Sequence, residues 1–258
     1  MSLSPASVTF ETKCWEQDWE VLLKSDRLEQ MIARNKFPFA ERVLIINNVD
    51  DPAEVVRHAR AAVERGVLTA FHVAADHADE ALRCFQIERD SFGPGYVYSI
   101  AELVGLYLCG TEFLLHFSSD SMLRSAVDWV TPTIELFRDP QGAVIGAANP
   151  MWHADWPRKE ATAENENYFA GHGFSDQCYL VRTSDFRAPI YNERHPHSER
   201  FPKYGGQLFE KRVDSWMLNH RRFRLTYKHA FYDHENIRRD SAKMDQPAVS
   251  QQREPKNP

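Results

Sequence analysis

The sequence predicts an α/β fold with a mixed, mostly parallel sheet flanked by helices. Strand-like apolar runs alternate with amphipathic, helix-like segments through the first half of the chain. Several helix-like segments also begin at a capping residue or end at a glycine. Such alternation is typical of a parallel sheet, because each crossover helix covers one face of the sheet. The chain has 258 residues, 43% of them hydrophobic, which is enough for one domain with a sizeable core.

The clearest helix signal follows the second expected strand. Asp51 can cap free amides, Pro52 suits the first helical position, and Glu54 completes a capping box. Gly66 ends the apolar series of this helix. The first-half strands are expected at residues 8–10, 43–46, 68–75, 96–98 and 111–117, with helices between them.

A second capping box, Ser99 with Glu102, predicts a helix that starts after the 96–98 strand and runs to Gly110. After about residue 150 the pattern loosens into loops rich in Trp, His, Asn and Gly. In that half we expect strands near 177–182 and 224–227 and a helix near 210–219.

Composition limits the classes of partner. The net charge of −6 gives no cationic field to attract nucleic acid or anionic lipid. Apolar runs such as 113–117 are far shorter than the roughly 20 residues that a membrane span needs, so we expect a cytoplasmic protein. The four cysteines lack metal or redox spacing. Residues 1–237 are expected to form a single domain and 238–258 a disordered tail.

Two polar segments follow strands, where ligands of open α/β sheets bind. The first contains Asn48 and Asp50, either of which can contact a base edge or simply form a turn, while Asp51 is expected only to cap the helix. In the second, Ser118-Ser119-Asp120 ends an apolar strand. Asp120 either holds a divalent cation or caps a following helix.

This order of strands, helices and polar segments resembles the nucleotide-binding half of GT-A glycosyltransferases over about residues 1–150, with 151–237 as the acceptor half. In that family the corresponding strand ends in an Asp-x-Asp motif whose last Asp binds manganese or magnesium. Ser118 replaces the first Asp here, and Asp120 matches the last. The resemblance implies a UDP- or GDP-sugar donor, Mn²⁺ or Mg²⁺, and the following donor-binding residues: Glu11, Asn48, Asp50, Ser99, Ser119 and Asp120.

The resemblance also implies a catalytic base and a late histidine ligand. Glu210 or Asp214 would deprotonate the acceptor hydroxyl, and their spacing of four places both on one helical face. Surface ion pairs explain these carboxylates as well. His229 and His234 would join Asp120 at the metal, unless they are ordinary loop histidines. The expected acceptor-binding residues are Trp152, Ser175 and Asp176.

The leading hypothesis is therefore a metal-assisted, inverting glycosyltransferase with a glycan or small-molecule acceptor, as in polysaccharide biosynthesis. A nucleotidyltransferase on a similar sheet would need a glycine-rich, basic loop after the first strand. The segment 12–15 contains no glycine. A carbohydrate-binding or scaffold protein that has lost its chemistry is the other alternative, suggested by Ser118 in place of Asp.

Overall fold

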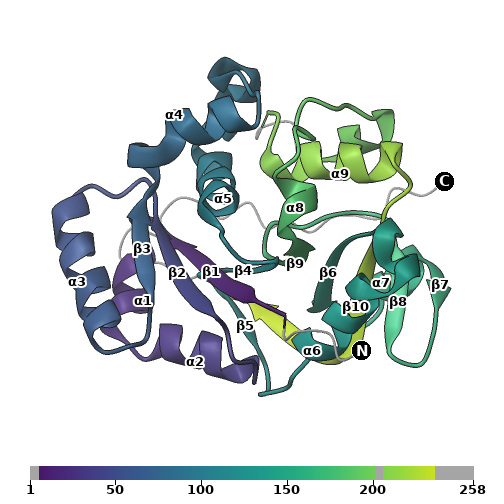
Figure 1. The fold of residues 1–258 in the computed structure, drawn as a ribbon, viewed down its shortest axis with the longest axis horizontal. Helices are drawn as coiled ribbons and strands as arrows, with labels where there is room; N and C mark the ends of the chain where they lie inside the picture. Colours follow the sequence, from purple (N-terminus) through teal and green to yellow (C-terminus); the bar gives the residue numbers. More distant parts are fainter. Residues whose placement is uncertain (1–5, 202–205, 236–258) are drawn as a thin grey trace, which may run out of the picture.

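A computed structural model describes residues 6–201 and 206–235. Within these residues ten strands form one sheet in the order β3-β2-β1-β4-β9-β6-β10-β8-β7, with β5 paired only to β10 (Figure 1). Along this path all strands except β9 and β8 run in the same direction, because β9 and β8 are antiparallel to both of their neighbours. The predicted mixed, mostly parallel sheet flanked by helices is confirmed.

The first half of the chain builds the parallel part of the sheet. Its strands are β1 (Val8–Cys14), β2 (Glu41–Ile46), β3 (Ala70–Val73) and β4 (Phe113–Ser118). β1 lies between β2 and β4, and the register pairs Glu11 with Val43 and with His116. The carboxyl ends of these four strands therefore meet at one edge of the sheet, as the sequence predicts for a ligand-binding edge.

The second half extends the same sheet. β9 (Cys178–Arg182) lies between β4 and β6 (Ile145–Met151), and β6 is parallel to the long β10 (Phe223–His234). β8 (Tyr168–Gly171) and β7 (Ala161–Glu164) form the far edge, while β5 (Ser121–Leu123) pairs with the end of β10. The pairing of β5 with β10 brings the carboxyl end of β10 to the carboxyl end of β4.

Helices cover both faces of the sheet (Figure 1). One face packs against α1 (Trp19–Lys24), α2 (Arg27–Arg34), α3 (Pro52–Glu64) and α6 (Val130–Arg138). The other packs against α4 (Ala74–Cys84), α5 (Tyr96–Leu108), α8 (Thr183–Phe186) and α9 (Phe209–Asn219). The short helix α7 (Trp156–Glu160) and the 3₁₀ turns η1 (Arg89–Gly95), η2 (Pro140–Val144) and η3 (Pro196–Arg200) complete the described elements.

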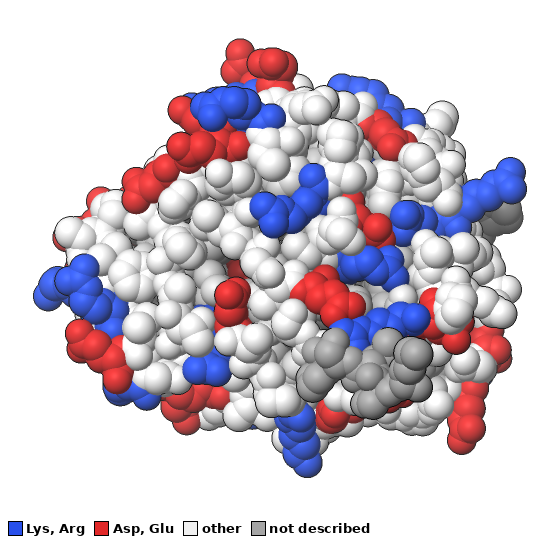
Figure 2. Space-filling model, in the orientation of Figure 1, with Lys and Arg blue, Asp and Glu red and all other residues white. Residues whose placement is uncertain are grey.

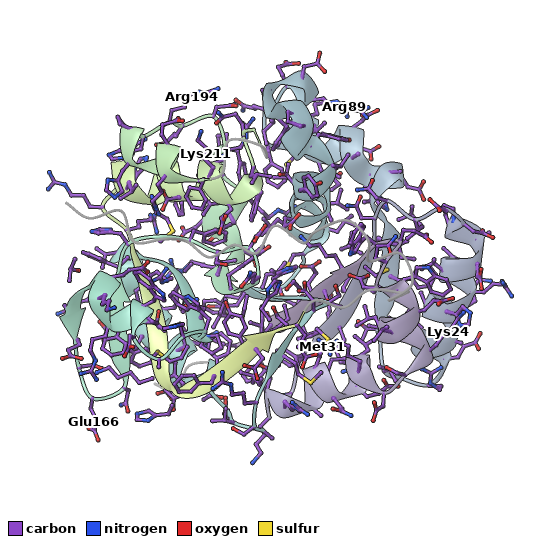
Figure 3. The ribbon with its side chains drawn as sticks, turned by 180° about the vertical axis from the view of Figure 1, so that it is seen from behind. Lys24, Met31, Arg89, Glu166, Arg194 and Lys211 are labelled. Atoms are coloured by element: carbon purple, nitrogen blue, oxygen red, sulfur yellow. The ribbon has the colours of Figure 1, made fainter. Side chains whose placement is uncertain are left out.

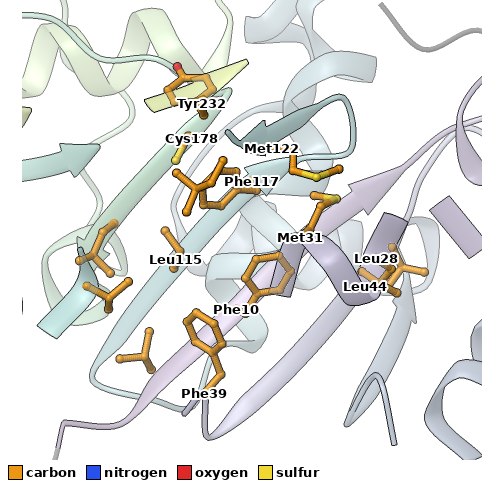
Figure 4. Packing of buried hydrophobic residues seen from close by; sticks show 14 of the residues in the cluster. Phe10, Leu28, Met31, Phe39, Leu44, Leu115, Phe117, Met122, Cys178 and Tyr232 are labelled. Carbon is orange, nitrogen blue, oxygen red and sulfur yellow. The ribbon is translucent and has the colours of Figure 1, made fainter. Parts of the chain in front are cut away.

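Alternating side chains of β1 divide the core into these two layers. Phe10 points into the first, where its ring centre lies 5.4 Å from that of Phe39 and 6.2 Å from that of Phe117 (Figure 4). Glu11 points into the second, beneath α5. Since Phe10 is completely buried, its replacement by alanine is expected to cost about 3–5 kcal/mol.

The helix at 51–66 follows its prediction, whereas the 96–98 strand does not exist. The Asp51 carboxylate accepts a hydrogen bond from the Glu54 amide at 3.1 Å, so it is a helix cap. Residues 96–98 form the first turn of α5 instead of a strand, because the helix already begins at Tyr96. Ser99 and Glu102 are therefore interior helical residues, and the second capping box is wrong. In a short segment, aromatic and β-branched residues are compatible with a strand and with a buried turn of helix, so they do not distinguish the two.

Charged side chains of both signs are interspersed on the face shown in Figure 2. No helix within residues 6–201 and 206–235 is long and apolar enough to cross a membrane. The predicted tail, 238–258, lies outside the described residues.

Candidate active site

The turn between β4 and β5 holds the first candidate group. Ser118 Oγ donates to Asp120 Oδ1 at 2.7 Å and lies 2.8 Å from Ser121 Oγ. Residues 121–123 form β5, so the alternative in which Asp120 caps a following helix is wrong. The hydroxyl of Ser118 instead orients the Asp120 carboxylate, whose side chain keeps 28% of its surface exposed.

His234, the last residue of β10, forms an ion pair with Asp120. The two are brought together because His234 pairs with Ser121 in the β5–β10 ladder, and His234 Nε2 lies 2.9 Å from Asp120 Oδ2. The hydrogen bond to Asp120 raises the pKa of His234. Burial raises the pKa of Asp120, but the hydrogen bonds from His234 and Ser118 and the charge of His234 outweigh it, so the net shift is downward.

A second carboxyl lies on the other side of the turn and was missed by the sequence reasoning. Asp18 is buried, and it accepts hydrogen bonds from the Ser119 hydroxyl and from the Trp15 amide. Burial, assisted by the negative charge of Asp120, raises the pKa of Asp18 to about 6. The hydroxyl of Ser119 is thus committed to Asp18. The only sequence signal for Asp18 was its place immediately before an amphipathic helix.

Arg27 connects the β4–β5 turn to the end of β10. Its Nε donates to the Ser119 carbonyl at 2.7 Å, and its Nη1 lies 2.9 Å from Glu235 Oε2. Its Nη2 is buried and has no hydrogen-bond partner among the residues that the structure describes. A guanidinium that has one nitrogen without a hydrogen-bond partner is suited to an anionic ligand at this edge.

His229 does not lie beside Asp120. It lies within the long strand β10, well before the end that reaches Asp120, and its Nε2 contacts Asn167 Oδ1 at 3.1 Å. The extended strand separates the two histidines that the sequence placed together. No group of three or more His, Cys, Asp or Glu side chains in the described ranges, 6–201 and 206–235, is placed to hold a metal ion.

The loop after β2 reaches the same edge of the sheet. The Asn48 side-chain amide donates to the Val97 carbonyl at 2.8 Å, and the Asp50 amide donates to Glu16 Oε2 at 2.9 Å. Asn48 has a φ of 51°, a left-handed conformation that asparagine tolerates. The loop is therefore tied to the start of α5, and the carboxylate of Asp50 remains exposed.

Two exposed aromatic rings border this loop. Trp15 directly follows β1 and is 49% exposed, and Tyr98, in the first turn of α5, is 59% exposed. A hydrogen bond from the Glu16 amide to the Asn48 carbonyl connects the Trp15 segment to the loop. Aromatic rings exposed to this degree at a ligand-binding edge can stack on a base. The sequence analysis placed Tyr98 in a strand and assigned no role to Trp15.

Glu11 and Ser99 do not reach this edge. Glu11 is 1% exposed and lies 2.5 Å from His116 Nδ1 in the middle of the sheet. Ser99, also 1% exposed, accepts a hydrogen bond from the Phe209 amide at 2.9 Å and so caps α9 from a neighbouring helix. Their assignment as donor contacts is corrected, since a buried side chain in the sheet or helix interior cannot contact a ligand at the edge.

The two candidate bases on α9 have different surroundings. Asp214 is fully buried and accepts hydrogen bonds from Ser198 Oγ at 2.6 Å and from both terminal nitrogens of Arg200 at 2.8 and 2.7 Å. It holds η3 against α9 and is excluded as a base. Glu210 lies in the first turn of α9, partly exposed. Lys211, the residue that follows Glu210, lies near Arg194 in Figure 3. Lys24 lies on the opposite side of that view.

The charges of Asp176 and Glu210 act on residues at the end of β10. Burial raises the pKa of Tyr232, and the charges of Asp176 and Glu210 raise it further. The charge of Asp176 also raises the pKa of His234. The charge of Asp176 therefore acts on both Tyr232 and His234, and the charge of Glu210 acts on Tyr232. Ser175 Oγ accepts from the Gln177 amide at 3.4 Å in the same loop.

Trp152 is half-buried and packs against the core, and its ring is covered by Arg224, whose guanidinium carbon lies 4.5 Å from the ring centre. An acceptor sugar cannot stack on the face that Arg224 occupies, so an acceptor would have to contact the rest of the ring, and the role of Trp152 stays a prediction.

No protein-family model matches this sequence, and no curated protein matches it at a significant level. Solved structures match its fold. The crystal structure of GalNAc-T7 with UDP, GalNAc and Mn²⁺ aligns with a TM-score of 0.56 and 10% identity, over 92% of this chain and 45% of that chain. The chain thus spans about half the length of GalNAc-T7 and has its GT-A fold.

Two further matches have lower TM-scores. TarS residues 1–349 from S. aureus align at 0.49 with 14% identity, over 89% of this chain and 60% of that chain. Glucosyl-3-phosphoglycerate synthase from Mycobacterium tuberculosis, in complex with Mn²⁺, UDP and glucosyl-3-phosphoglycerate, aligns at 0.40 with 12% identity, over 79% of this chain and 63% of that chain.

Proposed function

We propose that this chain is a glycosyltransferase that moves a sugar from a UDP- or GDP-sugar to a hydroxyl of a glycan or small molecule. The observation that carries the proposal is the Asp120–His234 pair at the carboxyl edge of β4 in a GT-A sheet. The charges of two partly exposed carboxylates, Asp176 and Glu210, act on Tyr232 near the same strand end. The edge thus combines a candidate diphosphate site with groups able to act on an acceptor.

The protein groups at this edge fit a divalent cation bound jointly with the donor. Asp120 supplies a carboxylate and His234 an imidazole, a mixed set that suits Mn²⁺ better than the oxygen-preferring Mg²⁺. Donor phosphate oxygens would complete the coordination, as is usual where a site has few protein ligands. Bound there, the cation would neutralise charge on the departing diphosphate. Since His234 must lose its proton to bind a metal, affinity should fall as the pH is lowered.

Residues of the chain itself would position the donor. Trp15 and Tyr98 offer rings for the base, and Asn48 and Asp50 lie beside them. Arg27, which is bound to the Ser119 carbonyl, has one guanidinium nitrogen without a partner among the described residues and would attract the diphosphate. Ser118 and Ser119 act indirectly, by orienting Asp120 and Asp18.

We assign the general base to Glu210 in an inverting displacement. Glu210 takes the proton of the acceptor hydroxyl while that oxygen bonds to the anomeric carbon of the sugar. The bond from this carbon to the diphosphate oxygen breaks at the same time, and its electron pair leaves with the nucleoside diphosphate. We assign acceptor binding to Asp176 and Ser175, which share one loop. Removal of a general base costs about 10²–10⁴-fold in rate, so Glu210→Gln should lower turnover to that degree.

A thermal-shift screen of UDP, GDP, CDP, ADP and dTDP, with and without Mn²⁺, tests the donor site. One nucleotide should raise the melting temperature in a metal-dependent way, and Asp120→Ala should abolish the rise. The matched control is Asp79→Ala, which removes an exposed carboxylate of α4 and should leave the rise intact. A nucleotide shift that Asp120→Ala leaves unchanged would refute the assignment.

A catalytically inactive GT-A protein is the second candidate, favoured by Ser118 where the family motif has Asp. Incubation with the sugar form of the nucleotide found in the screen separates the two. Release of free nucleoside diphosphate, by transfer or by slow hydrolysis, supports the enzyme. Binding with neither reaction supports the inactive candidate.

A further inference from the structure

A cavity lies on the α5 side of the sheet, away from the candidate active site. It has a volume of about 230 Å³ and is formed by β1, β2 and β3 together with the end of α5. Thr9 and Glu41 on its wall lie at the starts of their strands, so the cavity opens toward the amino ends of the parallel strands. The Asp120–His234 pair lies at the carboxyl ends.

The wall of the cavity includes a buried carboxylate with an unused oxygen. Glu11 is 1% exposed, and its Oε2 contacts His116. Its Oε1 has no hydrogen-bond partner in the described part of the chain. Gly105 allows α5 to lie close above it, since a Cβ there would be 3.2 Å from Glu11 Cδ. Buried carboxylate oxygens are rarely left without a donor, so this one calls for an N–H or O–H group in the cavity.

The charge of the residues that line the cavity indicates which kind of hydrogen-bond donor would bind there. Glu41 is a second carboxylate on the wall, and its Oε2 accepts from Thr9 Oγ1 at 2.9 Å. Burial lowers the pKa of His72, the charge of His77 lowers it further and the charge of Glu41 opposes both, so the net shift disfavours the charged imidazole. The residues that line the cavity include neither Lys nor Arg. The cavity is therefore suited to a cation and unsuited to an anion.

The size of the cavity and the residues that line it indicate an organic cation as the ligand. A volume of 230 Å³ equals that of roughly seven water molecules in the liquid, which is room for a short aliphatic chain. Val43, Ala70 and Leu108 offer apolar contacts for such a chain. Within residues 6–201 and 206–235 no three His, Cys, Asp or Glu side chains are placed to hold a metal ion. An alkylammonium group, in contrast, brings the N–H donors that Glu11 lacks.

We propose that this cavity binds the protonated amino group of a small alkylamine or diamine, with Glu11 and Glu41 as its carboxylate partners. The site is independent of glycosyl transfer, because it lies at the opposite edge of the parallel strands and shares no residue with the proposed donor or acceptor set.

The proposal is tested by NMR titration of the ¹⁵N-labelled full chain with 1,4-diaminobutane at constant pH and ionic strength. The amides of Ala70, His72 and Gly105 should shift saturably. The neutral 1,4-butanediol, of matched length, should produce no such shift. Equal binding of the diol, or shifts that stay linear and spread over the acidic surface, would overturn the proposal.

Substitutions of residues that line the cavity test whether the amine binds there. Ala70→Leu should abolish saturation by filling the cavity, and Glu11→Gln and Glu41→Gln should each weaken binding on the order of tenfold. Glu64→Gln, at an exposed position of α3, is the matched control for charge and should bind like the unmodified protein. If Glu11→Gln fails to fold, Ala70→Leu and Glu41→Gln decide the question, because both positions are partly exposed. Unchanged affinity in these two variants would refute the site.

Discussion

The buried carboxylate of Asp214 should be a strong determinant of stability. Asp214→Ala removes three hydrogen bonds to charged or buried partners, from Ser198 and from both terminal nitrogens of Arg200. Deleting one partner of a buried ion pair costs about 3–5 kcal/mol. The Arg200 side chain is 38% exposed, so water can recover part of its interaction, and the expected loss is at the lower end, about 3 kcal/mol.

Urea unfolding of the wild type and the variant, followed by circular dichroism, measures this loss. A change of about 3 kcal/mol corresponds to a fall of about 6–12 °C in melting temperature for a domain of this size. Asp79→Ala, which removes an exposed carboxylate, is the control and should change the free energy of unfolding by less than about 0.5 kcal/mol. A loss below about 1 kcal/mol in Asp214→Ala would refute the inference that this residue is structural.

Three further predictions concern the candidate site. Asp120→Asn should lower the pKa of His234, measured by NMR titration, because it removes the charged partner that raises it; an unchanged titration midpoint contradicts the pair. Asp18 keeps its proton up to about pH 6 when folded but only to about 3.8 when unfolded, so the free energy of unfolding should fall as the pH rises from 4 to 6, and Asp18→Asn should flatten this dependence in urea titrations. Trp15→Ala should weaken nucleotide binding on the order of tenfold by calorimetry, whereas Trp156→Ala, at a comparably exposed ring, should leave it unchanged.

The pKa shifts of Asp120 and His234 define the pH range over which this pair stabilises the fold. The pKa of His234 is raised from 6.5, so its contribution is complete below pH 6.5 and is lost as the pH rises through the folded value. The pKa of Asp120 is lowered from 3.8, so its contribution is complete above pH 3.8 and is lost as the pH falls through the folded value. The pair therefore stabilises the fold most between these two pH values.

Local signals in the sequence determined the fold class. The cap at Asp51 and the buried β2 and β4 strands were predicted, because caps and apolar periodicity act over a few residues. The same signals failed at residues 96–98, where a helix turn buried in the core is as apolar and aromatic as a strand.

Only the tertiary structure decided which of the candidate residues meet. His234 reaches Asp120, 114 positions earlier, because β10 pairs with β5, while His229 remains with the β7–β8 loops. Strand pairing between distant segments depends on the whole core and leaves no local pattern. The same holds for burial, which makes Asp214 a structural anchor and Glu210, four residues earlier, a surface group. Periodicity places both carboxylates on one helical face, but only the packing of η3 against α9 shows that Asp214 is the buried one.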